Sequence, residues 1–209
     1  MRHIILMSVI MLSQLANPAL AQTSSAKSYS PSISLDGVPS GKYIIDRSHV
    51  NAIFFVSHLG FSSYTGRFNA IDGTLFFDAA DPKMSVVKVS VDTSSVDTNN
   101  TLLEEKLRGE KWFDTKAFKM ASFTSTKVEK LSETRGKITG DFSLRGVSRP
   151  LTLDVTFNAG GENPFTSAQV LGFSAVGSFK RSDYGMKEYL PFVGDKVDLR
   201  IEAEFNQEK

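Results

Sequence analysis

The sequence predicts an all-β fold, in which about eight antiparallel strands form a barrel or a sandwich with one short inserted α-helix. Three observations support this prediction. Most of the chain alternates between apolar and polar residues, turn signals separate the alternating runs, and a single segment departs from the pattern. No internal repeat or second domain boundary is visible, so we expect one domain.

The alternation has a period of two, which is typical of strands that bury one face. It is clearest in residues 87–91, 138–144, 151–157 and 197–205. We expect turn-forming pairs such as Asp72-Gly73 to end the runs, because glycine accepts positive φ and aspartate forms local hydrogen bonds. A closed barrel removes exposed strand edges, which suits a chain that has no cysteine for disulfides.

Residues 99–109 break the alternation and predict the helix. Asn99 or Asn100 can cap its N-terminus, while Leu103 and Leu107 are four residues apart and share one helical face. The glycine at the end of the segment favours a C-terminal stop. We expect this helix to cross one end of the barrel or to lie against its wall.

The N-terminus has the three-part pattern of a secretory signal peptide, which we assign to residues 1–21. Its apolar stretch is too short for a stable membrane span, which takes roughly 20 residues. Residues 22–40 are rich in Ser and Pro and predict a flexible tether, and residues 41–209 form the β domain. The signal predicts a periplasmic protein, and full secretion begins with the same signal.

Composition and motifs exclude several functions. Lys and Arg number 24 against 23 Asp and Glu, so the chain lacks the basic excess of a nucleic-acid binder. The absence of Cys excludes thiolate metal sites and thiol catalysis. The sequence has no G-x-S-x-G elbow, Gly-rich phosphate loop or H-E-x-x-H motif, so we expect no cofactor, no metal and no enzymatic activity.

Few polar residues remain as functional candidates. His49 and His58 differ in parity, so an unbroken strand would point them to opposite faces. We interpret His49 as a turn cap, whereas His58 at the end of a strand can contact a ligand head group. Arg181, Asp183 and Tyr184 follow an apolar strand and predict either a charged rim or, more in keeping with a strand end, a structural ion pair.

The chain has 16 Phe, many of which fall on the faces that we expect to point inward. Each aromatic side chain fits a solid core, but small residues on some strands would leave internal space for one ligand. The inward aromatic candidates are Phe54, Phe76, Phe123, Phe142, Phe157, Phe173 and Phe179, and the space-leaving candidates are Gly140, Gly172, Ala175 and Gly177.

Several strings resemble the YceI-like, or polyisoprenoid-binding, family of exported bacterial proteins. They include YIIDRSHVNAIFFVSHLG, SVDTNN followed by WFD, ITGDFSLRGVSRPLTLDVTF and GFSAVGSFKRSDYG, and the resemblance covers residues 42–206. It implies an extended lipocalin-like antiparallel barrel whose pore holds an isoprenoid or similar lipid. Where the family tends to have Arg-Asp and then His-Leu, this chain has Leu103-Glu104 and Lys106-Leu107, so head-group contacts are expected to differ.

The leading hypothesis is therefore a periplasmic carrier or binding protein for a polyisoprenoid, an isoprenoid quinone or a similar lipid. The alternatives are an envelope interaction or stress protein with a filled barrel, and a lipid-modifying enzyme that uses His58. The sequence is also compatible with a homodimer. The expected ligand-binding residues are Phe54, His58, Leu107, Trp112, Phe123, Phe142 and Phe173.

Overall fold

The computed structural model describes residues 31–208, and the expected signal peptide at residues 1–21 lies outside this range. The strands are β1 (Gly41–His58), β2 (Ser62–Phe68), β3 (Ile71–Phe77), β4 (Val86–Asp92), β5 (Val96–Asp97), β6 (Met120–Lys130), β7 (Arg135–Leu144), β8 (Val147–Glu162), β9 (Gln169–Lys180) and β10 (Val193–Gln207). One α-helix, α1 (Thr101–Arg108), lies between β5 and β6.

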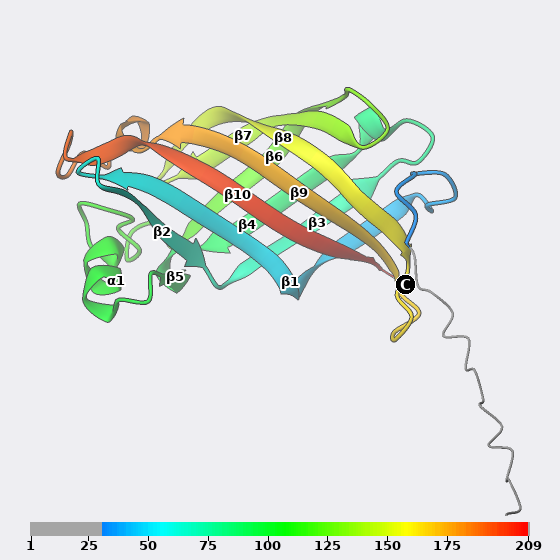
Figure 1. The fold of residues 1–209 in the computed structure, drawn as a ribbon, viewed down its shortest axis with the longest axis horizontal. Coiled ribbons are helices and arrows are strands. Elements are labelled where there is room, and N and C mark those ends of the chain that lie inside the picture. The colour runs from blue at the N-terminus through cyan, green and yellow to red at the C-terminus, as the bar shows by residue number, and fades with distance from the viewer. Residues whose placement is uncertain (1–30, 209) are drawn as a thin grey trace, which may run out of the picture.

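The strands form an antiparallel sheet that closes on itself through pairing of β10 with β1. Eight strands complete this barrel, in the order β1, β3, β4, β6, β7, β8, β9 and β10. Figure 1 shows them as long, tilted strands around one interior. The predicted fold class is confirmed, and the barrel is the arrangement that forms rather than the sandwich.

One edge of β1 pairs with β10, and the other edge pairs with two strands, β3 and β2. Its first residues pair with β3 and its second half pairs with β2, so β2 and β3 follow one another along β1. An irregularity between Ile45 and Val50 shifts the register against β10. Ile45 and Val50 both pack in the same core cluster although their parity differs, because the irregularity reverses which face points inward.

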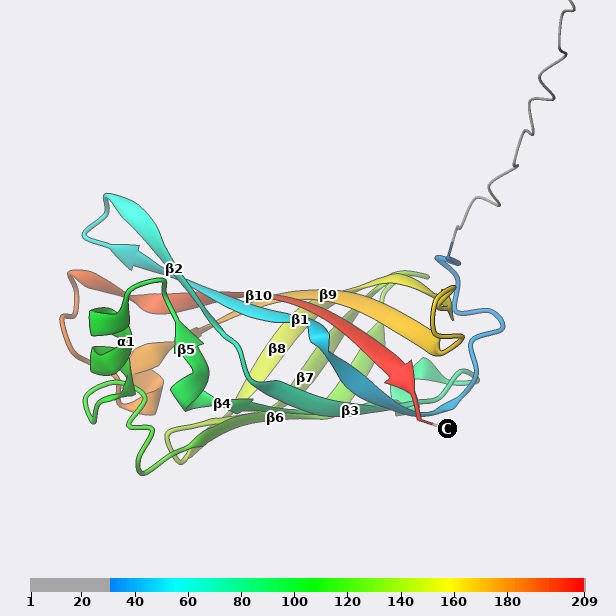
Figure 2. The same cartoon turned by 90° about the horizontal axis from the view of Figure 1, so that it is seen from below.

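The segment between β4 and β6 folds onto one end of the barrel, which we call the α1 end (Figure 2). Thr93 fixes its base, because its hydroxyl and its backbone N–H both donate to the carbonyl of Lys119, at 2.9 and 2.8 Å. Asn100 caps α1 by accepting a hydrogen bond from the Leu103 N–H at 3.1 Å, and Gly109 ends the helix. The predicted helix is thus confirmed at both termini.

The part of the expected tether that the structure describes, residues 31–40, lies against the opposite end of the barrel. Ser32 forms a β-bridge with Gly160, and Val38 is buried in the core. The Tyr43 hydroxyl donates to the Pro39 carbonyl at 2.7 Å. Residues 31–40 therefore pack against the barrel, and the expected boundary between tether and β domain at residue 41 is corrected for them. The reason is that the few apolar side chains of this polar stretch, such as Leu35 and Val38, pack against the core.

Most predicted strand faces are confirmed, but two side-chain assignments and the turn expected at Asp72-Gly73 were wrong. Both residues of that pair lie within β3 and pair with β4. Phe76 is exposed, because its neighbours Leu75 and Phe77 are the inward residues of β3. Gly172 also lies on the outer face, since Leu171 and Phe173 point inward on either side of it. In the described residues, no helix combines the length and the apolar character needed to cross a membrane.

Candidate ligand-binding pore

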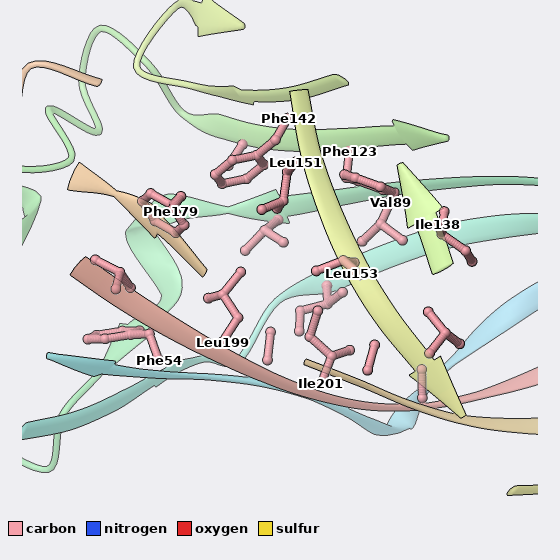
Figure 3. A pocket seen from close by; sticks show the side chains of 18 of the residues that line it. Phe54, Val89, Phe123, Ile138, Phe142, Leu151, Leu153, Phe179, Leu199 and Ile201 are labelled. Atoms are coloured by element: carbon pink, nitrogen blue, oxygen red, sulfur yellow. The ribbon is translucent and has the colours of Figure 1, made fainter. Parts of the chain in front are cut away.

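The barrel encloses a cavity of about 940 Å³, which is in the size range of small-molecule sites. Its wall is built from the inward faces of the barrel strands together with α1 and the segment that follows it. Figure 3 shows side chains from separate strands pointing into this space, among them Phe142, Leu151 and Leu199. We call this cavity the pore.

The middle of the pore is aliphatic. The wall there is formed by residues from four different strands, namely Val89, Ile138, Leu153, Leu199 and Ile201. Leu153 of β8 and Ile201 of β10 lie on the same side of the barrel, with β9 between their strands, and Ile201 packs against the cluster that contains Leu153 (Figure 3). Such a surface attracts a hydrocarbon chain without directional contacts, because burial out of water supplies the free energy.

Aromatic rings gather toward the α1 end. Phe142 and Phe179 have ring centroids 5.2 Å apart, and Tyr184 completes a cluster at 5.4 and 5.3 Å from them. Across the pore, Phe68 lies 5.8 Å from Phe54 and 5.3 Å from a ring of the segment after α1, Phe113. These separations and tilted or edge-on geometries are those at which aromatic pairs attract one another.

The opposite end, which we call the far end, carries the loops at residues 78–85, 131–134 and 163–168. Phe157, Phe173 and Phe205 form an aromatic group there, with centroid separations of 5.6 and 6.1 Å. Beyond this group the lining becomes polar, with Lys130 and Arg135 among its residues. The pore therefore changes from apolar to charged toward the far end.

The structure places every expected ligand-binding residue on the pore wall, and their role in binding stays a prediction. His58 and Leu107 lie at the α1 end, on β1 and α1. Aromatic content alone missed the aliphatic middle of the pore, although the parity of the strands already identified those positions. The seven expected residues on the wall are Phe54, His58, Leu107, Trp112, Phe123, Phe142 and Phe173.

Glycines accommodate neighbouring rings rather than leave empty space. A Cβ on Gly66 would lie 2.3 Å from Cζ of Phe54, its cross-strand partner. A Cβ on Gly140 would lie 2.6 Å from Cζ of Phe123. The large aromatic side chains therefore reach their places because these two positions have no side chain.

Arg181 is the buried cation of the site, at only 2% exposure. Its guanidinium donates to four backbone carbonyls, those of Met186, Glu188, Val193 and Gly194, at 2.8–2.9 Å. Burial lowers its pKa from the ordinary value. The expectation of a charged rim or an ion pair was wrong, because Arg181 uses its donors to hold the loop between β9 and β10.

Trp112 stacks near this cation, with the Arg181 guanidinium carbon 5.1 Å from the centre of its ring. Its other neighbour is Tyr189, whose ring lies 6.4 Å away. The indole Nε1 is buried and has no hydrogen-bond partner among the described residues. Trp112 thus contributes packing and a cation–π contact, and carries the cost of an unsatisfied donor.

The two histidines are far apart along β1. Nine residues of extended strand separate them by about 30 Å. His49 lies in the irregular part of the strand and its Nδ1 is 3.0 Å from Oδ2 of Asp46, a contact that raises the pKa of His49. The pKa of Asp46 is lowered, first by the hydrogen bond from the Ser48 hydroxyl and then by the contact with His49. His58 is exposed at the end of β1, and no partner for its ring occurs among the described residues.

Asp46 and His49 lie close to Glu204 on β10. One ligand atom from each of the three residues lies within 4.8 Å of the others, so in the described part of the chain this group has the spacing to hold a metal ion. His49 is exposed, and Asp46 already accepts hydrogen bonds from Ser48 and Asn206. These existing contacts explain the arrangement without a metal.

Comparison with known proteins agrees with the architecture. The model of the YceI-like domain family matches residues 43–205. Protein YceI of Escherichia coli is 37% identical over 169 residues, which are 80% of this chain and 87% of that protein.

Two solved structures share the fold. A YceI protein of Campylobacter jejuni has a TM-score of 0.67 at 28% identity, and the match covers 73% of this chain and 90% of that one. A domain from Saccharophagus degradans, described as a polyisoprenoid binding domain, has a TM-score of 0.61 at 14% identity, over 81% of this chain and all of that one. With a family match that spans nearly the whole barrel, the chain belongs to the YceI-like domain family.

Proposed function

We propose that this protein binds a long apolar amphiphile, such as a polyisoprenoid or an isoprenoid quinone, within the pore. The observation that carries the proposal is the cavity of about 940 Å³ with an almost entirely apolar wall. The polyisoprenoid binding described for the Saccharophagus degradans domain, which has the same fold, supports the choice of ligand class.

The energetics favour an extended hydrocarbon. Each CH₂ group that leaves water contributes about 0.8 kcal/mol, so a long chain binds well with few polar contacts. The aliphatic middle and the aromatic groups at both ends offer such a chain continuous apolar contact. A barrel filled with side chains, which the interaction or stress protein requires, does not agree with this cavity.

We further propose that the protein acts as a carrier or sequestering protein in the periplasm. The signal-peptide pattern of residues 1–21 supports this location. Fractionation of the native host, with N-terminal sequencing of the processed chain, tests it. A mature protein that begins at Gln22 in the periplasmic fraction agrees with the proposal, and an unprocessed cytoplasmic chain contradicts it.

Two neighbouring residues of β9 offer a matched test of binding. Ala175 lies on the pore wall, whereas Val176 points outward and is 49% exposed. Ala175→Trp places an indole inside the pore. Because the indole occupies space that the ligand would fill, the affinity for a fluorescent isoprenoid is expected to fall by about tenfold or more. Val176→Trp is expected to bind like the wild type.

The fold of both variants is checked by urea unfolding. Equal binding by Ala175→Trp, Val176→Trp and the wild type, with all three folded, would show that the ligand does not occupy the pore. Equal loss of binding in both variants would also contradict the proposal, because only one of the two indoles enters the cavity.

A further inference from the structure

The α1 end of the pore is bordered by exposed apolar side chains. We define the apolar rim as Leu59, Phe61, Tyr189 and Phe192, of which Phe61 and Phe192 are 88% and 66% exposed. Leu59, Tyr189 and Phe192 also belong to the pore wall. The apolar lining therefore continues from the interior onto the outer surface.

Backbone and side-chain contacts join the rim into one surface. The Leu59 N–H donates to the Phe192 carbonyl at 2.8 Å, which links the β1–β2 hairpin to the loop before β10. Lys106 of α1 donates to the Tyr189 hydroxyl at 2.9 Å. Figure 2 shows the hairpin, this loop and α1 gathered at the same end of the barrel.

Two rim residues have backbone conformations that bulky side chains rarely adopt. Leu59 has a φ of 54° and Tyr189 a φ of 59°. Leu59 and Gly60 are the central residues of a turn that the Phe61 N–H closes by donating to the His58 carbonyl at 3.0 Å, and positive φ in such a turn favours glycine, asparagine or aspartate. An apolar residue here costs stability and remains half exposed, and such strain is found most often at functional contacts.

At the far end, the exposed apolar side chains are not continuous with the pore wall. Phe165 and Leu131 are exposed there, at 94% and 62%, but neither lines the pore. The lining at that end includes Lys130, Glu133 and Arg135. Lys106 and Arg181 line the α1 end, but the pore-lining residues with exposed large apolar side chains, Leu59, Tyr189 and Phe192, all lie there among the described residues. A hydrocarbon chain that leaves through the α1 end therefore meets apolar side chains on the outer surface, which the charged lining of the far end does not offer.

We propose that the apolar rim docks on the surface of a lipid bilayer and that the ligand enters and leaves the pore through it. The second part rests on the proposed function, because such ligands reside in bilayers. Aromatic and aliphatic rim residues suit the boundary between headgroups and acyl chains. Lys106, which donates to the Tyr189 hydroxyl, and the exposed Lys187, two residues before Tyr189 in the sequence, add positive charge toward anionic lipid headgroups.

Vesicle flotation tests the docking directly. The probe is a vesicle of phosphatidylethanolamine and phosphatidylglycerol, mixed with the processed chain. We expect the wild type to float with the vesicles and the Phe61→Ser/Phe192→Ser variant to lose about tenfold or more of its partitioning. The matched control, Leu131→Ser/Phe165→Ser, removes two equally exposed apolar residues from the far end and is expected to change partitioning less than about twofold.

Three results bear on the proposal. A wild type that does not bind vesicles overturns it, and so does a control variant that loses as much partitioning as the rim variant. Retention of partitioning by Phe61→Leu/Phe192→Leu, with unchanged unfolding midpoints, supports an apolar contact rather than a folding defect.

A second readout separates docking from ligand binding. Isoprenoid supplied in detergent is expected to bind the single variant Phe61→Ser, whose residue lies outside the pore wall, as it binds the wild type. Transfer from vesicles to this variant is expected to slow in proportion to the partitioning that it loses. Rim-dependent vesicle binding without any isoprenoid uptake supports docking and refutes the proposed function. Isoprenoid uptake without vesicle binding by the wild type supports the function and refutes docking.

Discussion

Replacing Arg181 by methionine removes four hydrogen bonds that hold the loop between β9 and β10 against the α1 end of the pore. Hydrogen bonds to a charged group each contribute about 1.5–3 kcal/mol. Methionine offsets part of this loss, because an apolar side chain has no charge to desolvate and still packs beside Trp112. We therefore expect the free energy of unfolding to fall by about 3–5 kcal/mol.

Urea unfolding followed by circular dichroism measures this change, with Arg200→Met as the control. Arg200 is exposed on β10, and among the described residues its side chain forms one ion pair, with Glu202 at 3.2 Å, so its replacement is expected to change the free energy by less than about 0.5 kcal/mol. Hydrogen exchange of the Leu59 and Val193 amides, which bond within the loop region, should accelerate in Arg181→Met. Equal stability of Arg181→Met and the wild type would refute this account of the buried cation.

Three further predictions follow from individual contacts. Trp112→Phe is expected to stay within about 1 kcal/mol of the wild type in urea unfolding because it removes an unsatisfied donor, whereas Trp112→Ala should lose about 2–4 kcal/mol of packing. Gly66→Ala is expected to cost about 1–3 kcal/mol through its clash with Phe54, and Phe54→Leu in the same chain should recover part of that loss; full stability of Gly66→Ala alone would refute the clash. Hydrogen bonds from Asn69, Asn99 and Arg67 lower the pKa of Asp97 from 3.8 to about 2, so its stabilisation is present above pH 3.8 and is lost as the pH falls through about 2. The stability difference between the wild type and Asp97→Asn should therefore shrink over that window, and a difference independent of pH would contradict this assignment.

The features that the sequence predicted correctly are those set by local chemistry. Alternation identified the inward faces of β4, β7, β8 and β10, since one-residue shifts exchange the two faces of a strand. The helix was bounded correctly because Asn100 and Gly109 satisfy its terminal backbone groups locally. The Phe of β8 and β9 fell on the pore side for the same reason.

The errors arise where a distant part of the chain decides the outcome. Phe76 lies in a run in which both faces are apolar, so its orientation depends on packing against neighbouring strands. The irregularity after Ile45 reverses the parity of β1, which is visible only in its pairing with β10. The burial of Arg181 could not be predicted from the sequence, because its partners are backbone carbonyls and every residue has one.

The candidate site also combines features that local sequence predicts with features that only the folded chain brings together. Residues of the pore wall were predictable from strand parity, whereas the apolar rim joins a hairpin, a helix and a loop that lie far apart in the sequence. Closure of the barrel by β1 and β10 brings those segments together. Only the assembled barrel therefore indicates which end of the pore meets the apolar surface.

The central claim is that the pore holds an apolar amphiphile, and native mass spectrometry of the processed protein from a bacterial periplasm tests it most directly. We expect an additional mass of several hundred daltons, on the order of a ligand that fills a cavity of this size, and we expect organic solvent to extract it. A protein without any bound mass, which also takes up no added isoprenoid, would contradict the claim.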